Sequence, residues 1–258
     1  MTELARIDWR GRPIDLEYEW VGDAASALPV VVFLHEGLGS VAMWKDFPAR
    51  LCNEHGLRGL VYSRYGYGRS TPKPAGETWP GDFMQRQARE VLPALFEALR
   101  IERPWLFGHS DGASIALLYA SEFSTAGVVA VAPHLFVEDI SIASIEAART
   151  AYSTTDLRTR LARYHADPDS AFRGWNDAWL SPAFRAWNIE AEVAKIACPV
   201  LAVQGEDDEY GTLEQVRALV RHVPGAKLLE LAASGHSPHR DQPERLIREA
   251  GAFIVEGS

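Results

Sequence analysis

The sequence predicts an α/β protein: a doubly wound, mainly parallel eight-stranded sheet with a helical segment inserted after the sixth strand. Two observations support this fold class. Short, uninterrupted apolar runs alternate with amphipathic helical segments, which is typical of parallel strands covered on both faces. Residues 137–196 then interrupt the alternation with a mostly helical stretch before the strands resume. In such a sheet, ligands bind at the carboxyl ends of the strands.

The composition indicates one large domain and excludes several partners. The chain has 258 residues, of which 47% are hydrophobic, enough to bury a sizeable core. We expect this core at residues 1–136 and 197–258, with residues 137–196 folded as a helical lid over the strand ends. A net charge of −9 argues against nucleic acid or an anionic membrane as partner. A small-molecule substrate is the expected partner, and the oligomeric state is open.

The sequence also indicates a cytoplasmic protein. No apolar run approaches the roughly eighteen residues that a membrane span needs, and the N-terminus has no signal-peptide core. Cys52 and Cys198 are the only cysteines, and we interpret them as reduced thiols.

The expected elements follow in order along the chain. Strands are predicted at residues 4–9, 14–21, 30–34 and 59–63, in the run that begins at Trp105, and at 127–132, 199–204 and 226–231. Helices are predicted at residues 41–54, 82–100, 212–222 and 241–255, and directly after Ser110. The first two strands form a hairpin joined by Gly11, Arg12 and Pro13. Pro93 lies inside one predicted helix and indicates a kink there or a late helix start.

One motif carries the strongest chemical signal. The buried run from Trp105 ends in Gly-His-Ser-Asp-Gly at residues 108–112, and a helix of small apolar residues follows. Glycines two positions before and after Ser110 remove Cβ atoms that would collide where strand and helix approach. Such a turn exposes the serine hydroxyl and aims helix N-terminal amides at whatever lies beside it. Ser110 is therefore a candidate nucleophile, and the alternative is an ordinary helix-capping serine.

Acidic and basic groups follow two later strands. Glu206, Asp207 and Asp208 come directly after the seventh strand, and His236 comes after the eighth. A serine hydroxyl becomes a good nucleophile when a neutral imidazole removes its proton and a carboxylate orients that imidazole. All these groups are expected at the carboxyl ends of strands, where ligands bind in sheets of this kind.

With these residues the chain resembles the α/β-hydrolase superfamily over essentially its whole length. The motifs are the chain order Ser…Asp…His, the Gly-rich turn that starts at His35, and Gly235-His236 followed by Pro243 at the family's spacing. The resemblance is to the lid-bearing branch of serine esterases and carbon–carbon hydrolases. It implies Ser110 as nucleophile, His236 as base and Asp208 as acid. The family acid falls three residues after the glycine that ends strand seven, which selects Asp208.

The resemblance also implies which amides bind the oxyanion and which other acids remain. The amides are those of Asp111, directly after the nucleophile, and Gly37, two residues after the turn histidine. Glu206 and Asp207 stay as alternative acids, and so do Glu138 and Asp139, because some family members place the acid after strand six.

Two departures from the family pattern bear on the substrate. Glu36 occupies a position where the family turn usually has glycine, so the amide geometry of that turn is not carried over from the family. Serine at the nucleophile position excludes the epoxide hydrolases and haloalkane dehalogenases, which use aspartate. Glu36 and Asp111 are both expected near the mouth of the site, where two carboxylates would disfavour an anionic acyl group. The alternative is that both side chains turn away and bond backbone amides.

The remaining candidates concern the pocket. Trp175, Trp179 and Trp187 are spaced as lid core, with one or two of them expected to line the pocket. The candidate pocket residues are Glu36, His134, Phe136, Trp175 and Trp179. His35 is interpreted as a structural histidine whose ring bonds within its own turn.

No cofactor and no metal are expected. His236, His239 and Asp241 could mimic a ligand cluster, but one short spacing without a second cluster is weak evidence for a metal site. The Gly-Tyr-Gly at residues 66–68 is interpreted as a turn rather than a dinucleotide fingerprint.

The sequence thus predicts a serine hydrolase that cleaves a small, largely apolar carboxylic ester through an acyl-enzyme intermediate. An aromatic lid over a serine nucleophile favours a substrate of that kind. The alternatives are a carbon–carbon bond or lactone hydrolase with the same three residues, a non-catalytic ligand-binding relative, and a cofactor-free dioxygenase or perhydrolase.

Overall fold

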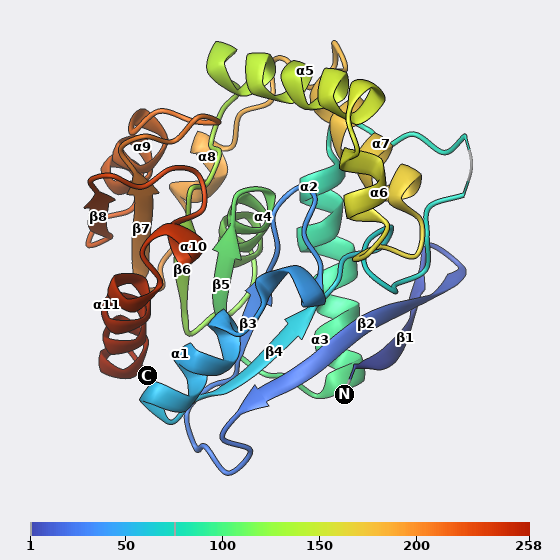
Figure 1. Cartoon of the computed structure of the whole chain (residues 1–258). Coiled ribbons are helices and arrows are strands. Elements are labelled where there is room, and N and C mark those ends of the chain that lie inside the picture. Colours follow the sequence, from blue (N-terminus) through green and yellow to red (C-terminus); the bar gives the residue numbers. More distant parts are fainter. Residues whose placement is uncertain (1, 75) are drawn as a thin grey trace.

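A single eight-stranded sheet organises the chain, with strand order β1-β2-β4-β3-β5-β6-β7-β8 (Figure 1). The computed structural model describes residues 2–74 and 76–258, so Met1 and Ala75, both within the expected core, lie outside the described residues. β1 pairs antiparallel with β2 and β2 antiparallel with β4, whereas all later neighbours are parallel. The predicted fold class, a mainly parallel eight-stranded sheet flanked by helices, is confirmed.

Each observed strand overlaps its predicted range. The strands are β1 (Glu3–Trp9), β2 (Arg12–Gly22), β3 (Val31–Leu34), β4 (Arg58–Tyr62), β5 (Trp105–His109), β6 (Gly127–Val131), β7 (Val200–Gly205) and β8 (Lys227–Leu231). The first turn lies one residue earlier than predicted, at Arg10 and Gly11, both of which have positive φ. Pro13 belongs to β2, where it faces only β1, because pairing of β2 with β4 begins at Tyr18.

Helices cover both faces of the sheet, and the core is divided accordingly. They are α1 (Phe47–His55), α2 (Phe83–Arg86), α3 (Leu92–Leu99), α4 (Asp111–Ala120), α5 (Asp139–Thr154), α6 (Leu157–Leu161), α7 (Pro168–Trp179), α8 (Glu190–Val193), α9 (Glu214–His222), α10 (Pro238–Asp241) and α11 (Pro243–Glu256). Val31 and Phe33 of β3 pack with α1 and α11, whereas Val32 and Leu34 pack with α3 and α4. This alternation explains why β3 reads as an unbroken apolar run.

Two predicted helices are less regular than their periodicity indicates. The helix expected at residues 41–54 is a 3₁₀ turn at Val41–Trp44 followed by α1, because Lys45 adopts a positive φ between them. The helix expected at 82–100 consists of α2, a π-helical turn at Gln87–Val91, and α3. Pro93 lies in the first turn of α3, where its missing N–H costs nothing, so the irregularity that it predicted falls just before it.

The insertion after β6 is helical, as expected, and supplies α5 to α8. In Figure 1, α5, α6 and α7 lie beyond the end of the sheet toward which β5 points, which is the carboxyl edge of the parallel strands. Within the described residues, no helix is long and apolar enough to cross a membrane.

Candidate active site

Ser110 lies in a strained corner between β5 and α4. Its backbone has φ 54° and ψ −122°, a conformation that residues other than glycine rarely adopt. A Cβ on Gly108 would lie 2.4 Å from the Ala113 Cα, and one on Gly112 would lie 2.1 Å from the Leu34 carbonyl oxygen. Only glycine therefore fits at either position, for the reason that the motif predicts.

A chain of hydrogen bonds runs from Ser110 through His236 to Asp208. The Ser110 Oγ lies 2.9 Å from the His236 Nε2, and the His236 Nδ1 lies 2.9 Å from both carboxylate oxygens of Asp208. Because an ionised carboxylate only accepts, the Nδ1 of His236 carries the proton and donates it to Asp208. The Nε2 is then free to accept the Ser110 hydroxyl proton, which is the geometry of a general base.

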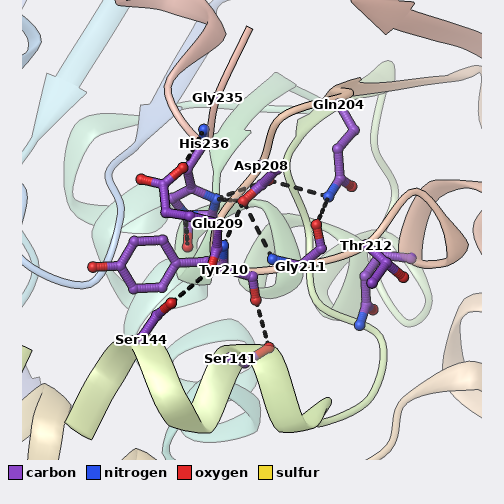
Figure 2. A network of polar contacts seen from close by, with 12 residues as sticks. Ser141, Ser144, Gln204, Asp208, Glu209, Tyr210, Gly211, Thr212, Gly235 and His236 are labelled. Atoms are coloured by element: carbon purple, nitrogen blue, oxygen red, sulfur yellow. Dashed lines mark hydrogen bonds and ion pairs between the residues drawn. The ribbon is translucent and has the colours of Figure 1, made fainter. Parts of the chain in front are cut away.

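The loop after β7 holds the Asp208 carboxylate in place (Figure 2). The Tyr210 and Gly211 amides donate to its Oδ1 at 2.8 and 3.2 Å, and the Gln204 side chain donates to its Oδ2 at 3.1 Å. Burial opposes ionisation of Asp208, but hydrogen bonds from His236 and the Tyr210 amide bring its pKa below the usual value. Asp208 is therefore charged at neutral pH and stabilises a proton on His236.

The other candidate acids do not reach His236. Glu206 and Asp207 are exposed to solvent beside the buried Asp208. Glu138 accepts hydrogen bonds from the loop before α9, and Asp139 forms an exposed ion pair within the inserted segment. Of the five carboxylates weighed from the sequence, the structure thus brings Asp208 to the histidine.

Two main-chain amides beside Ser110 have no partner. Among residues 2–74 and 76–258, neither the Gly37 N–H nor the Asp111 N–H has a recorded hydrogen bond. Asp111 is the first residue of α4, so its N–H belongs to the unpaired positive end of that helix. Gly37 lies two residues after His35, in the same turn. The His35 Nδ1 donates to the Glu36 carbonyl at 2.7 Å, in agreement with a structural role for that histidine.

The Asp111 side chain is enclosed and partly neutralised. Its Oδ1 accepts from the Trp179 indole N–H at 3.0 Å, and its Oδ2 lies 3.7 Å from the Arg64 Nη2. Burial raises the pKa of Asp111, and Arg64 and Trp179 oppose that rise. The side chain is only 1% exposed, so it presents little charge to a substrate.

Glu36 is the more accessible acid, with 18% of its side chain exposed. Its carboxylate oxygens lie 3.6 Å from the His109 Nδ1 and 3.6 Å from the Arg240 guanidinium. Burial opposes its ionisation, but the neighbouring His109 imidazole holds the pKa of Glu36 well below the usual value. In the described part of the chain, neither expected acid bonds a backbone amide through its side chain: Asp111 faces an indole and a guanidinium, and Glu36 faces an imidazole and a guanidinium.

A cavity of about 240 Å³ opens onto the Ser110–His236 pair. Its apolar wall comes largely from the inserted segment, through Ile145 of α5, Leu157 and Leu161 of α6, and Trp175 and Trp179 of α7. The wall and the reactive groups therefore come from different parts of the chain.

Four of the five pocket residues expected from the sequence line this cavity: Glu36, His134, Trp175 and Trp179. Phe136 is not among the described residues that line it. Its carbonyl instead accepts from the Gln215 side chain, and its backbone bridges to Asn188. His134 is almost fully buried, and burial lowers its pKa to about 3, so it is neutral.

Three residues that the sequence interpretation did not single out contact this machinery. Gln204 bonds Asp208, Arg64 faces Asp111, and the His109 Nε2 donates to the His236 carbonyl at 2.6 Å. Gln204 and His109 lie in the last two residues of their strands, and Arg64 lies two residues after the end of β4. A polar residue at the carboxyl end of a strand is the sequence signal that could have marked all three. No cluster of three or more His, Cys, Asp or Glu side chains suited to a metal ion occurs in the described part of the chain.

Comparisons with known proteins find matches over most of the chain. The sequence profile of the Alpha/beta hydrolase family matches residues 31–249. A human protein named Serine hydrolase BPHL is 24% identical over 257 residues, covering 93% of this chain and 83% of that protein.

Solved structures show the same fold at low identity. The enol-lactonase from Burkholderia xenovorans has a TM-score of 0.73 and 20% identity, covering 94% of this chain and 97% of that one. The carboxylesterase CesB from Bacillus subtilis also has a TM-score of 0.73, with 22% identity over 100% of this chain and 93% of that one.

Proposed function

This chain is a hydrolase that belongs to the alpha/beta hydrolase family, and we propose that it cleaves a small, largely apolar carboxylic ester through an acyl-enzyme on Ser110. One observation carries the proposal. The Ser110 Oγ, His236 and Asp208 form a continuous chain of 2.9 Å contacts whose open end lies in a cavity. The human relative's name, a serine hydrolase, supports the same nucleophile.

The proposed reaction follows from the hydrogen-bond directions. The Ser110 Oγ attacks the ester carbonyl carbon while its proton passes to the His236 Nε2, and Asp208 stabilises the resulting imidazolium. The carbonyl oxygen becomes an oxyanion held by the Gly37 and Asp111 amides. His236 then protonates the leaving alcohol, and the acyl group stays on Ser110.

Hydrolysis of the acyl-enzyme by water completes the cycle and uses the same groups. A water molecule attacks the acyl carbonyl and gives its proton to the His236 Nε2. The second oxyanion occupies the same two amides before it collapses. The imidazolium returns the proton to the Ser110 Oγ, which releases the carboxylic acid and restores the enzyme.

The inserted segment is proposed to act as a lid, residues 137–196, over a core of residues 1–136 and 197–258. Its helices supply the apolar wall of the cavity, which excludes water from the reacting groups. Ser141 and Ser144 of α5 also bond the Tyr210 and Glu209 carbonyls, each at 2.5 Å, so α5 is tied to the loop that carries Asp208 (Figure 2).

The cavity favours a neutral acyl group. Glu36 and Glu209 line it, and among the described lining residues Arg240 is the one Lys or Arg side chain, at 3.6 Å from Glu36. The cavity volume of about 240 Å³ lies below the range of about 300–1,000 Å³ for drug-sized ligands, which favours short chains.

The nucleophile is tested by substitution. Ser110→Ala is expected to lower kcat for 4-nitrophenyl butyrate by about 10⁴-fold or more while the fold is retained, and Asp208→Asn by about 10⁴-fold. Ser121→Ala, at the other end of α4, is the matched control and should leave kcat unchanged. Wild-type turnover by the Ser110→Ala protein, with labelling of it by a fluorophosphonate, would refute the assignment.

The substrate class is tested with a panel. Neutral short-chain aryl esters are expected to react at least about 10-fold faster, by kcat/KM, than the matching succinate half esters, since two carboxylates face the cavity. A lactone and a dienoic diketone belong in the same panel, because a higher kcat/KM for either would replace the ester assignment. Absence of fluorophosphonate labelling would favour a ligand-binding protein, and oxygen consumption would favour a dioxygenase.

A further inference from the structure

The peptide group between Glu36 and Gly37 is bonded in an unusual way. Its carbonyl oxygen accepts three hydrogen bonds: from the His35 Nδ1 at 2.7 Å, the Arg64 Nη2 at 2.8 Å and the Gly39 N–H at 3.1 Å. A carbonyl oxygen has two lone pairs, so this acceptor is fully used. The N–H of the same peptide group is that of Gly37, which has no hydrogen-bond partner among residues 2–74 and 76–258 and lines the cavity beside Ser110.

Arg64 is the charged member of these three donors. It directly follows the serine after β4, its side chain is fully buried, and its guanidinium lies 4.6 Å from the centre of the Tyr67 ring. Its backbone N–H donates to the His35 Nε2 at 2.9 Å, so Arg64 also sets the tautomer with which His35 bonds the Glu36 carbonyl.

The Arg64 guanidinium also lies close to the side chain of Asp111, the residue that supplies the second amide beside Ser110. The Arg64 Nη2 lies 3.7 Å from the Asp111 Oδ2, and Asp111 supplies the other N–H beside Ser110. Within the described residues, the Nε and Nη1 of Arg64 have no hydrogen-bond partner. The charge of this buried arginine is thus directed at the Glu36 carbonyl and the Asp111 carboxylate, and a buried charge is costly unless such partners compensate it.

A charge at one end of a peptide group acts on the other end. The group is planar, so fixing the carbonyl oxygen also fixes the direction of the N–H bond. A carbonyl that accepts from a cation is polarised, and hydrogen bonds in such a chain strengthen one another. Donors that are already oriented need no reorganisation when charge develops in the transition state.

We propose that Arg64 is a positioning residue for the oxyanion site: its buried guanidinium orients and polarises the Glu36–Gly37 peptide and ties it to Asp111. This inference rests on the proposed function. The proposed role accounts for the burial of a charged side chain at this place in the fold. It assigns Arg64 no contact with the substrate.

The test compares Arg64→Met, which has a similar length without charge, with Arg64→Lys, which keeps the charge. Arg69→Met, an exposed arginine in the same loop, is the matched control. Active sites are counted by fluorophosphonate end-point labelling, so that kcat for 4-nitrophenyl butyrate refers only to folded protein. The Ki of an alkyl trifluoromethyl ketone, which forms a tetrahedral oxyanion on Ser110, is measured for each variant.

Arg64→Met is expected to lower kcat per labelled site about 10- to 100-fold, less than the 10²–10³-fold typical of deleting an oxyanion donor. KM should stay within about twofold, and the ketone Ki should rise by the same factor as KM/kcat, since both report transition-state binding. Arg64→Lys should recover part of the loss, and Arg69→Met should behave as wild type.

A kcat per labelled site within about twofold of wild type, or a loss confined to KM, would overturn the inference. If Arg64→Met does not fold, Arg64→Gln, which also lacks the charge, decides: unchanged kcat per labelled site and ketone Ki would refute the role. If the wild-type protein neither reacts with the fluorophosphonate nor hydrolyses the ester, the proposed function fails instead, and the two failures are thereby distinguished.

Discussion

At the scale of single residues, the corner between β5 and α4 leaves no room for a Cβ atom on either glycine. A Cβ on Gly112 would lie 2.1 Å from the Leu34 carbonyl oxygen, which is backbone and has no freedom to rotate away. Gly174 in α7 offers the opposite case, because its nearest neighbours are Trp79 ring atoms at an ordinary 3.4 Å. Substitution by alanine should therefore change the free energy of unfolding in opposite directions at the two positions.

Gly112→Ala is expected to lower the free energy of unfolding by about 1–3 kcal/mol, because β3 and α4 must separate. Gly174→Ala should raise it by about 0.5–1 kcal/mol, since alanine loses less backbone entropy in a helix. Urea denaturation of the two variants beside the wild type measures both changes. Equal effects would show that the packing of α4 on β3 is looser than described.

At the scale of elements, α7 links local sequence to the cavity wall. Its N-cap, Asp167, accepts from the Asp169 and Ser170 amides at 3.0 and 2.9 Å, and Pro168 occupies the first turn. This is a complete helix start, readable in the sequence. The helix that it begins carries Trp175 and Trp179 to the cavity.

Asp167→Ala is expected to destabilise the protein by about 1 kcal/mol, equivalent to a Tm lowered by about 2–4 °C. Asp156→Ala is the matched control, because Asp156 precedes α6 without making a side-chain cap bond. Thermal unfolding of both variants provides the measurement. Similar Tm values for the two would mean that the Asp167 cap does not stabilise α7.

At the scale of the whole molecule, the core holds histidines that are neutral in the folded state. Burial is the largest cause that lowers the pKa of His35, His134, His165 and His239. In the unfolded chain the same groups titrate near the usual value of about 6.5. Below that pH the unfolded state binds more protons than the folded state, so stability falls as pH falls.

The free energy of unfolding is therefore expected to be greatest above about pH 6.5 and to decline as pH drops toward the lowered pKa values. Each histidine contributes up to about 1.4 kcal/mol per pH unit in that window. Urea midpoints between pH 7.5 and 5 measure the slope. A flat wild-type profile would contradict the prediction.

Local pattern was enough to predict the sheet. Apolar runs such as Val31–Leu34 mark strands buried on both faces, because each face packs against helices and every position must be apolar. The placement of Ser110, Asp208 and His236 after the fifth, seventh and eighth strands was also readable, since parallel strands deliver their carboxyl ends to one edge. The π-helical turn before Pro93 was readable only as an irregularity, because its form depends on packing.

Contacts between distant segments depend on packing. The family spacing selected Asp208 over Glu206 and Asp207, but its contact with His236 exists only in the folded chain, where the nearby Tyr210 and Gly211 amides hold the carboxylate. Phe136 lies outside the cavity lining, and α5 to α7 supply its wall, because side-chain direction is set by the neighbours of each element.

The buried Arg64 shows this limit most clearly. Sequence places it after a strand, but its approach to the Glu36 carbonyl and to Asp111 joins three segments that are far apart along the chain. Hydrophobic periodicity and glycine positions act over a few residues and are written in the sequence. The distances between the ends of different strands depend on how the whole sheet and its helices pack, and they exist only in the folded molecule.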